Sequence, residues 1–399
     1  MHTLDNFALN CGLKASSPYI MEKFFPLNSK SYIVFYPFGS SNSRSYDYWR
    51  DVIKLIHPML RAENIDIIQI GAKDSQKLEG CIDLTGQVDF NQTQYLIRRS
   101  RLLLAADSFV VHQASSLGKK IVSLYSDSSP LNTGPYWSKK KDVVCLESKT
   151  EGKIYSYAEI ESPKTINEIY PENIAKAVAK LLRLKLDYPY ETLNIGDQYH
   201  NLNVESVPSI TVNIDNIQID SIIVRMDLNF DQSLLVHQLQ QSSCSIITDK
   251  YIDNNILTTF KQRLAQFVFL IKDKSDEELE SDYQYIQGLY KIGVQCLLLS
   301  EEVGETLNKL KLKFLDYCPI HSKPNKSKDD YTFLKGKDTE NLYYKSSRFL
   351  IKDGQAYYCE AAMREGVTVP SVGFSDPQKV IDSPLFWKES DKFTILEKH

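Results

Sequence analysis

The chain has 399 residues, of which 42% are hydrophobic and 25% charged, as in an ordinary globular protein, and it is long enough for two domains. Its 47 basic and 51 acidic residues give a net charge of -4, which excludes a wholly basic nucleic-acid-binding body. The seven cysteines form no CxxC pair, which argues against a disulfide framework or a zinc site. We find neither a signal-peptide pattern nor an apolar run near the ~20 residues of a membrane span, and we therefore expect a cytoplasmic protein without a membrane span.

The first part of the chain alternates short β-branched or aromatic runs with amphipathic stretches. We expect strands at 31–37, 65–72, 81–86, 101–107, 120–126 and 142–148. We expect helices at 46–61, 90–100 and 171–185. Strands that alternate with helices indicate a parallel sheet covered on both faces, so residues 1–188 are predicted to form a Rossmann-like α/β lobe.

Residues 189–208 show no periodicity and contain turn formers, and we interpret them as an interdomain linker. A second α/β series follows, so residues 209–399 are predicted to form a second Rossmann-like lobe. Its expected strands lie at 219–227, 244–250, 266–273 and 294–300, and its helices at 231–241 and 277–291. The lysine-rich segment 321–339 is interpreted as a mobile loop.

The loop after the first strand is the first candidate for ligand binding. Gly39, Ser40 and Ser41 can present backbone N–H groups and hydroxyls to phosphate oxygens at the start of a helix. The guanidinium of Arg44 could then neutralise a diphosphate. The alternative is that these residues only form a turn and cap the helix.

Polar residues also follow two later strands. Gly71 and Asp74 follow the second strand, where a carboxylate can accept hydrogen bonds from ribose hydroxyls, although a solvated loop charge is the alternative. Asp107 and Ser108 stand where a buried strand gives way to a helix, and His112 lies one helical turn further on. Ser108 could hold a phosphate, Asp107 a sugar hydroxyl, and protonated His112 a departing diphosphate. The alternative reading is a helix N-cap and an interior histidine.

Together these residues and their spacing resemble glycosyltransferase family 9, the family of ADP-heptose:lipopolysaccharide heptosyltransferases. The similarity covers about residues 1–185. Its diagnostic element is Asp-Ser/Thr-Gly-x-x-His-x-Ala, which corresponds to residues 107–114, with Phe109 in place of the usual glycine. The other matching motifs are Gly39-Ser40-Ser41 with Arg44 and Trp49, Gly71 with Asp74, residues 83–86, and Thr133-Gly134-Pro135.

The resemblance implies a two-lobed arrangement of the GT-B type and the transfer of a sugar from a nucleotide-diphosphate-sugar donor to an acceptor hydroxyl. It implies a glycan or lipid-linked acceptor of the lipopolysaccharide type, and neither a metal nor another cofactor. The donor would be held by Gly39, Ser40, Ser41, Arg44, Gly71, Asp74, Asp107 and Ser108, with His112 assisting departure of the diphosphate.

In that family an acceptor-binding lobe precedes the donor lobe and supplies the catalytic base. The segment 222–239 is similar to the opening of that lobe, where a basic residue ends a strand and an aspartate follows. Those residues are Arg225 and Asp231 here, so Asp231 would be the general base of a permuted enzyme. A helix N-cap is the alternative for Asp231, and Asp227 is the second candidate for the base.

Two other functions remain open at this stage. The chain could be a nucleotide-sugar-binding or scaffold module without catalysis, because the second half can be read as a degenerate repeat with Asp353-Gly354 in the place of Asp107-Ser108. The acceptor could also be a modified nucleic acid, with the segment 321–339 in contact with phosphates, although a glycan or lipid acceptor is favoured.

Overall fold

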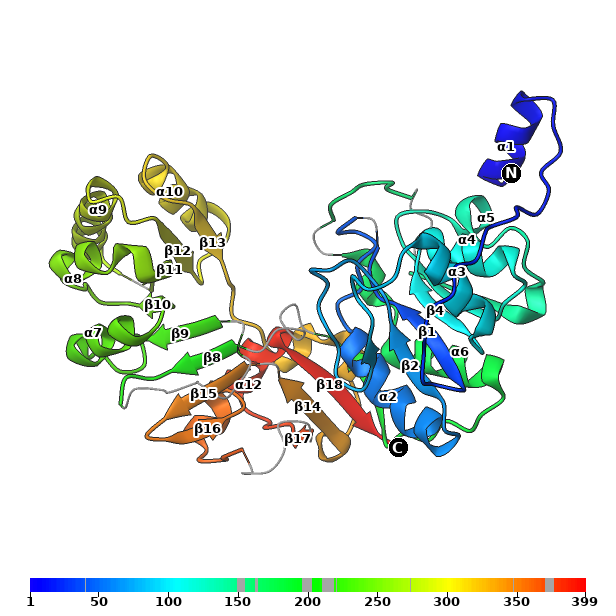
Figure 1. The fold of residues 1–399 in the computed structure, drawn as a ribbon. Helices are drawn as coiled ribbons and strands as arrows, with labels where there is room; N and C mark the ends of the chain where they lie inside the picture. The colour runs from blue at the N-terminus through cyan, green and yellow to red at the C-terminus, as the bar shows by residue number, and fades with distance from the viewer. Residues whose placement is uncertain are drawn as a thin grey trace. The chain divides into compact units, whose positions relative to one another are not determined.

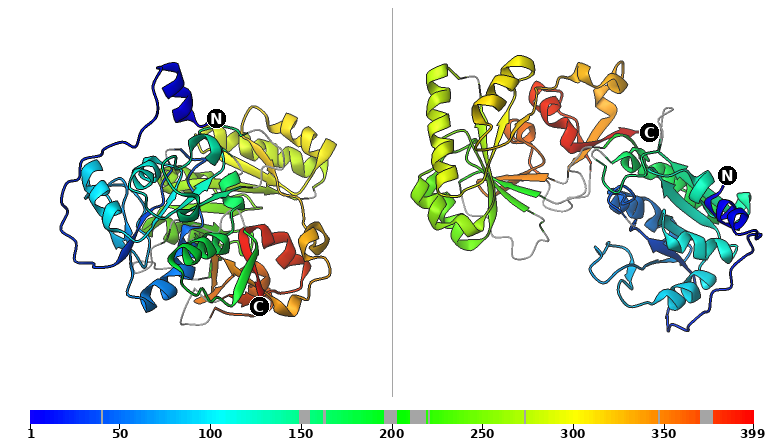
Figure 2. Two further views of the ribbon diagram at one scale, coloured as in Figure 1. Left: turned by 90° about the vertical axis from the view of Figure 1, so that its right-hand side faces the viewer. Right: turned by 90° about the horizontal axis from the view of Figure 1, so that it is seen from above.

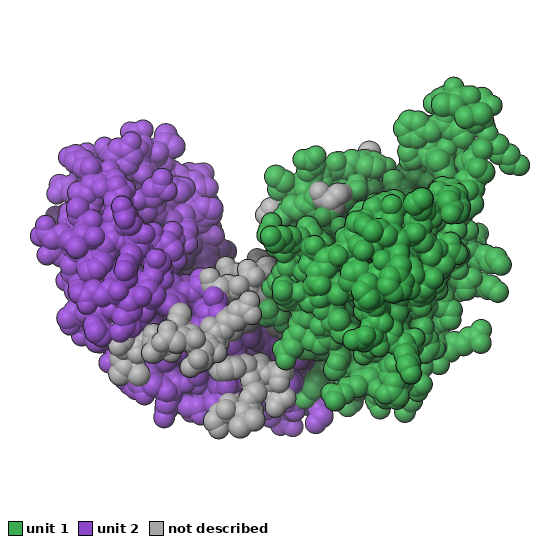
Figure 3. Space-filling view, viewed as in Figure 1, with its two compact units in different colours: residues 1–192, 399 green, residues 193–398 purple. Residues whose placement is uncertain are grey.

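The computed structural model describes residues 1–39, 41–148, 155–161, 164–195, 203–209, 219, 221–272, 274–346, 348–369 and 377–399. They form two compact units, residues 1–192 with His399 and residues 193–398, shown in green and purple in Figure 3. Ser40, one of the predicted donor-binding residues, lies outside the described residues. Within the part of the chain that the structure describes, no helix is long and apolar enough to span a membrane.

The first unit is built on a six-stranded parallel sheet, as the sequence predicts (Figure 1). Its strand order is β3-β2-β1-β4-β5-β6, which is the order of dinucleotide-binding Rossmann folds. The strands are β1 (Tyr32–Tyr36), β2 (Asp66–Gln69), β3 (Ile82–Asp83), β4 (Leu103–Ala106), β5 (Ile121–Tyr125) and β6 (Val143–Glu147). The order reverses between β1 and β4, and ligands of such sheets bind beyond the carboxyl ends of the strands at that point.

Helices cover both faces of this sheet, and β1, β4 and β5 are therefore buried along nearly their whole length. Helix α2 (Trp49–Ala62) packs on α6 (Pro171–Leu182), and α3 (Phe90–Arg99) packs on α4 (Phe109–Ser116). The α3 and α4 side of the core contains Leu96, Ile97 and Val110. The short helices α1 (Thr3–Asn10) and α5 (Pro130–Thr133) complete the unit.

The second unit contains an eight-stranded sheet in the order β13-β12-β11-β10-β9-β8-β15-β16, in which only β16 is antiparallel to its neighbour. These strands are β8 (Asn203–Ser206), β9 (Ser221–Arg225), β10 (Cys244–Thr248), β11 (Leu264–Ile271), β12 (Cys296–Ser300), β13 (Ile320–Ser322), β15 (Arg348–Lys352) and β16 (Gln355–Tyr357). Three further strands, β14 (Leu342–Ser346), β17 (Gln378–Lys379) and β18 (Phe393–Lys398), pair in antiparallel fashion. Both units are therefore α/β with mostly parallel sheets.

The helices of the second unit belong to two apolar cores. One core joins β9–β13 to α7 (Gln232–Gln241), α8 (Asn254–Thr259), α9 (Asp276–Lys291) and α10 (Gly304–Phe314). The other joins β14, β15 and β18 to α11 (Glu360–Arg364) and α12 (Pro384–Glu389). In the right-hand view of Figure 2, the green-to-yellow helices α7–α10 lie along one side of the sheet of this unit.

The predicted linker is not a structureless connection. The division between the units falls at residues 192 and 193, inside β7 (Tyr190–Asn194), and β8 lies in the same segment. The sequence of β8 shows no apolar pattern, because Glu205 occupies one of its buried positions. The second unit thus begins before residue 209.

Two further expectations for the second half are wrong. The lysine-rich segment 321–339 holds short 3₁₀ turns, and buried Tyr331 and Leu334 fix it to the core of β14 and α12. The pair Asp353-Gly354 forms the turn of the β15–β16 hairpin, with φ angles of 51° and 76°, and does not start a helix as Asp107-Ser108 does. The second half is therefore not a copy of the β4–α4 segment.

Glu205 explains how β8 tolerates a buried charge. Its carboxylate accepts from Nη1 of Arg225 at 2.6 Å and lies 2.7 Å from Nε of Arg348. All three side chains are nearly inaccessible to solvent. Burial alone would raise the pKa of Glu205, but the charges of Arg348 and Arg225 lower it to about 2.

We predict that Glu205→Gln destabilises the second unit by about 3 kcal/mol, because it leaves two buried arginines without their shared anion. Chemical denaturation followed by circular dichroism measures this loss. Because the folded pKa lies below the ordinary value, the stabilisation by Glu205 is complete above about pH 4.5 and is lost as the pH falls towards 2. The exposed Glu365→Gln is the control, and an equal loss in both variants would contradict the prediction.

Candidate functional site

The site of the first unit lies at the carboxyl ends of β1, β4 and β5. Arg44 reaches it from the loop after β1, and its Nε donates to both carboxylate oxygens of Asp127 at 3.0 and 2.9 Å. Its Nη1 lies 3.5 Å from Oδ2 of Asp107. Asp107 follows β4 and Asp127 follows β5, so Arg44 links the ends of three neighbouring strands. We call these three side chains the arginine–aspartate cluster.

The members of this cluster differ in exposure, and burial affects the pKa of both Arg44 and Asp107. Asp107 and Asp127 are 4% and 2% exposed, whereas the side chain of Arg44 is 26% exposed and remains accessible to a ligand. Burial alone would lower the pKa of Arg44, but the hydrogen bond to Asp127 and the charge of Asp107 raise it. Burial raises the pKa of Asp107, although Arg44 and the hydrogen bond from Ser128, 3.0 Å long, act in the opposite direction. The site is thus a fixed cation held by two buried carboxylates.

The loop after β1 is folded tightly enough to position Arg44. Ser43 is fully buried and its hydroxyl donates to the carbonyl of Ala158 at 2.6 Å, while Ser41 lies 2.8 Å from it. Gly39 passes so close to Arg44 that an added Cβ would lie 2.4 Å from the Cβ of Arg44. Trp49, the first residue of α2, donates from its indole to the carbonyl of Pro37 at 2.8 Å. The loop therefore does more than cap the helix, since it carries a cation to the strand ends.

At the start of α4, Ser108 was expected either to hold a phosphate or to cap the helix. Ser108 occupies the N-cap position, but its hydroxyl donates to the carbonyl of Ala106 at 3.0 Å and makes no cap bond. Phe109 is half-exposed and stacks on Phe90 with ring centroids 5.8 Å apart. Its side chain therefore lies at the surface, beside the end of the strand, and not in the core.

His112 lies one turn further along α4 and is half-buried. Burial lowers the pKa of His112, and the nearby charge of Asp107 raises it by a smaller amount. His112 thus lies within the electrostatic range of Asp107, and its assistance to a departing diphosphate stays a prediction. An imidazole in this state gains a proton when a second anion approaches.

Gly71 and Asp74 lie beyond the end of β2 and are not joined to this cluster by any contact among the described residues. The carbonyl of Gly71 accepts from the backbone N–H of Gly86 at 2.8 Å, and an added Cβ would lie 2.9 Å from the ring of Phe38. Asp74 lies exposed in the turn that follows. A role for these two residues in binding the donor stays a prediction.

Sequence reasoning missed Asp127 and Ser128. They lie in a Ser/Pro-rich segment whose composition is typical of a loop, which concealed them. They could have been found from their position directly after β5, a buried strand that pairs with β4. Asp107 was singled out because it directly follows a buried strand in the same way.

Asp231, the predicted general base, lies in the second unit as the N-cap of α7. Its Oδ1 accepts from the backbone N–H groups of Ser233 and Leu234 at 2.9 and 3.1 Å and from the Ser233 hydroxyl. Hydrogen bonds from Ser233 and Leu234 lower the pKa of Asp231. No hydrogen bond joins its Oδ2 to a described residue, and its role as general base stays a prediction.

Comparison with known proteins finds relatives of the first unit by sequence. Residues 10–162 match glycosyltransferase family 9 (heptosyltransferase). The first unit is therefore similar to this family. Over 122 residues the chain is 31% identical to lipooligosaccharide heptosyltransferase 2 of Haemophilus ducreyi, a match that covers 29% of this chain and 33% of that protein. The chain thus spans about a third of the length of this curated relative.

Solved structures of the same family show a partial likeness. A family 9 glycosyltransferase of Veillonella parvula is 22% identical with a TM-score of 0.32, covering 45% of this chain and 50% of that one. The ADP-heptose lipopolysaccharide heptosyltransferase II of Escherichia coli is 20% identical with a TM-score of 0.31, covering 39% and 48%. The similarity of the first unit to family 9 rests on the sequence match and not on these superpositions.

We predict that Asp127→Asn lowers the stability of the first unit by about 1–3 kcal/mol, because Arg44 loses its paired acceptor within a buried site. Thermal denaturation measures the change. Asp66→Asn, at an exposed strand start, serves as the control. A variant as stable as the control would show that the pairing of Arg44 with Asp127 contributes nothing to stability.

Proposed function

We propose that the chain is a glycosyltransferase that takes a sugar from a nucleotide-diphosphate donor, bound by the first unit, and transfers it to an acceptor hydroxyl. The observation that carries this proposal is the arginine–aspartate cluster at the point where the strand order of a Rossmann sheet reverses. A nucleotide bound there would place its phosphates against Arg44 and the start of α4.

The donor-binding roles follow from the positions of the side chains. The side chain of Arg44 is 26% exposed, and we propose that its guanidinium, which Asp127 and Asp107 hold in place, faces the diphosphate. Asp107 can accept from a sugar hydroxyl while Ser128 and Arg44 hold its carboxylate in place. His112 is close enough to the charge of Asp107 to be tuned by it, and the growing negative charge of the departing diphosphate would favour its protonated form.

We propose that these groups replace a metal ion in stabilising the departing diphosphate. A fixed guanidinium, backbone N–H groups at a helix start and a protonated imidazole all face the place where charge develops. The acceptor hydroxyl would be deprotonated by Asp231 of the second unit through its Oδ2. The acceptor is proposed to be a glycan or a lipid-linked glycan.

A panel of ADP-, UDP-, GDP- and dTDP-sugars in a thermal-shift assay tests the donor site. We expect one donor class to raise the melting temperature by several degrees. We expect Arg44→Gln and Asp107→Asn to weaken its binding at least tenfold, because each removes a charged partner of the ligand. Arg50→Gln, on the exposed side of α2, should bind normally. No shift with any donor would reject both the enzyme and a nucleotide-sugar-binding module.

The catalytic role of Asp231 can be separated from its capping role. Asparagine caps a helix as well as aspartate does, so Asp231→Asn should fold with unchanged stability and lose turnover by a factor of about 10²–10⁴. Asp253 caps α8 in the same way, and Asp253→Asn is the matched control with full turnover expected. Donor binding without turnover on glycan, lipid-linked and nucleic-acid acceptors would instead favour a binding module. Full activity of Asp231→Asn would contradict its role as the base, and Asp227 would then be the candidate to test.

A further inference from the structure

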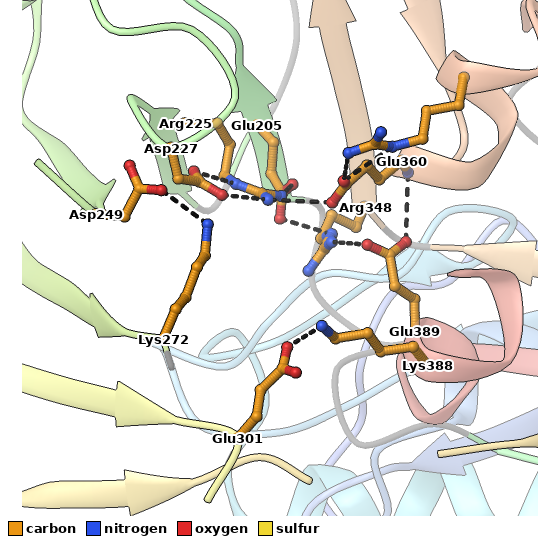
Figure 4. A network of polar contacts seen from close by, with 11 residues as sticks. Glu205, Arg225, Asp227, Asp249, Lys272, Glu301, Arg348, Glu360, Lys388 and Glu389 are labelled. Carbon is orange, nitrogen blue, oxygen red and sulfur yellow. Dashed lines mark hydrogen bonds and ion pairs between the residues drawn. The ribbon is translucent and has the colours of Figure 1, made fainter. Parts of the chain in front are cut away.

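The second unit contains a pocket of its own, with a volume of about 320 Å³. Ile247, Leu270 and Leu299 line it on an apolar side, which we call its floor. Charged side chains from α11, α12 and the strand ends also line it, and Figure 4 shows most of these. All lining residues belong to residues 193–398, so the pocket is complete within this unit. Its volume is at the lower end of the range of small-molecule sites.

The floor of the pocket is the face of the sheet that α7–α10 do not cover. Burial alternates along β10 and β12, so that Ile246 and Leu298 are fully buried while Ile247 and Leu299 are only half-buried. Ile246 and Leu298 belong to the core formed with those helices, and their neighbours in the strands therefore point to the opposite face. Parallel sheets normally have both faces covered, which makes a half-buried floor unusual.

The arginines beside this floor differ in how well they are paired. Each nitrogen of Arg225 has a partner, because it donates to Glu205, to both oxygens of Asp227 at 2.8 Å and to Glu360 at 3.2 Å. Arg348 is 5% exposed, yet its buried Nη2 has no hydrogen-bond partner within the described part of the chain and lies 3.8 Å from Glu389. In Figure 4 the other terminal nitrogen of Arg348, which has no dashed line, points into the space bounded by Lys272, Glu301 and Lys388. A buried donor without a partner is costly unless a ligand completes it.

Two lysines add positive charge that no described carboxylate pairs with at ion-pair distance. Lys323 follows β13, and Lys392 follows α12; both line the pocket. Burial, and after it the charges of Arg348 and Lys323, lower the pKa of Lys392, while the charges of Glu389 and Glu205 act in the opposite direction. An anion bound beside Lys392 would raise this pKa and favour its charged form. The remaining lysines are matched, since Lys272 pairs with Asp249 at 2.7 Å and Lys388 with Glu301.

We infer that this pocket binds a small anionic sugar, whose phosphate or carboxylate group contacts Arg348, Lys323 and Lys392 and whose ring lies on the floor of Ile247, Leu270 and Leu299. Glu301 and Asp227 keep acceptor capacity for the hydroxyls of such a ring. The inference concerns a second binding site, and it stands whether or not the first unit transfers a sugar.

Isothermal titration of the full chain with glucose 6-phosphate, glucuronate, inorganic phosphate and glucose tests this inference. We expect glucose 6-phosphate, glucuronate or both to bind and neutral glucose not to bind. The preferred compound then shows whether phosphate or carboxylate is the natural group. Lys323→Gln and Lys392→Gln should each weaken binding about tenfold, which corresponds to one charge-assisted contact.

Lys311→Gln, on the exposed side of α10, is the matched control and should bind as the unchanged chain does. Asp107→Asn should also bind normally, which separates this site from the donor site. The inference is overturned if neither anionic sugar binds, if glucose binds equally well, or if both lysine variants keep full affinity. Circular dichroism of the variants checks that they are folded, and the use of two separate lysines keeps the test valid if one variant is unstable.

Discussion

The ligand edge of the first unit depends on one cation. Asp107 and Asp127 end neighbouring strands and are both removed from water, so their charges would repel each other across the end of the sheet. Arg44 resolves this conflict because it contacts both, and it can do so only because the loop at Gly39 folds back closely enough. The same contacts hold the guanidinium still. The interaction that stabilises the strand ends therefore also holds the guanidinium rigid, so that under the proposed function it would require little further ordering when an anionic ligand binds.

In the second unit, too, a buried charge lies between two charges of opposite sign, but the central group is an anion. There the buried anion is Glu205, and two arginines from the neighbouring strands β9 and β15 surround it. The network extends through Asp227, Glu360 and Glu389, but it does not satisfy every donor of Arg348. The first unit has its cation held by carboxylates, whereas Lys323 and Lys392 beside the pocket of the second unit form no ion pair with a described carboxylate.

The regular parts of the fold could be predicted from the sequence, because runs such as Tyr32–Tyr36 and helices such as Pro171–Leu182 show clear periodicity. Strand β8 could not be predicted, since the charge of Glu205 is neutralised by residues that are distant in sequence. The lysine-rich segment misled for a related reason: its composition indicates a solvated loop, but two apolar side chains, Tyr331 and Leu334, anchor it. At the site, Asp107 and Arg44 were found from their positions after strands, whereas Asp127 needed knowledge of which strands are neighbours.

The position of Glu205 also affects the order in which the chain can fold during synthesis. Strand β8 is the first strand of its sheet to be made, and Arg348, one of the two cations that neutralise its carboxylate, comes far later in the chain. At ordinary rates of synthesis the delay is on the order of ten seconds. During that interval the sheet can assemble from β8 to β13 only with a partly compensated charge at its centre. The ribosome-bound chain therefore exposes an unfinished sheet edge, at which chaperones or a misplaced cation can act before the native arginine is available.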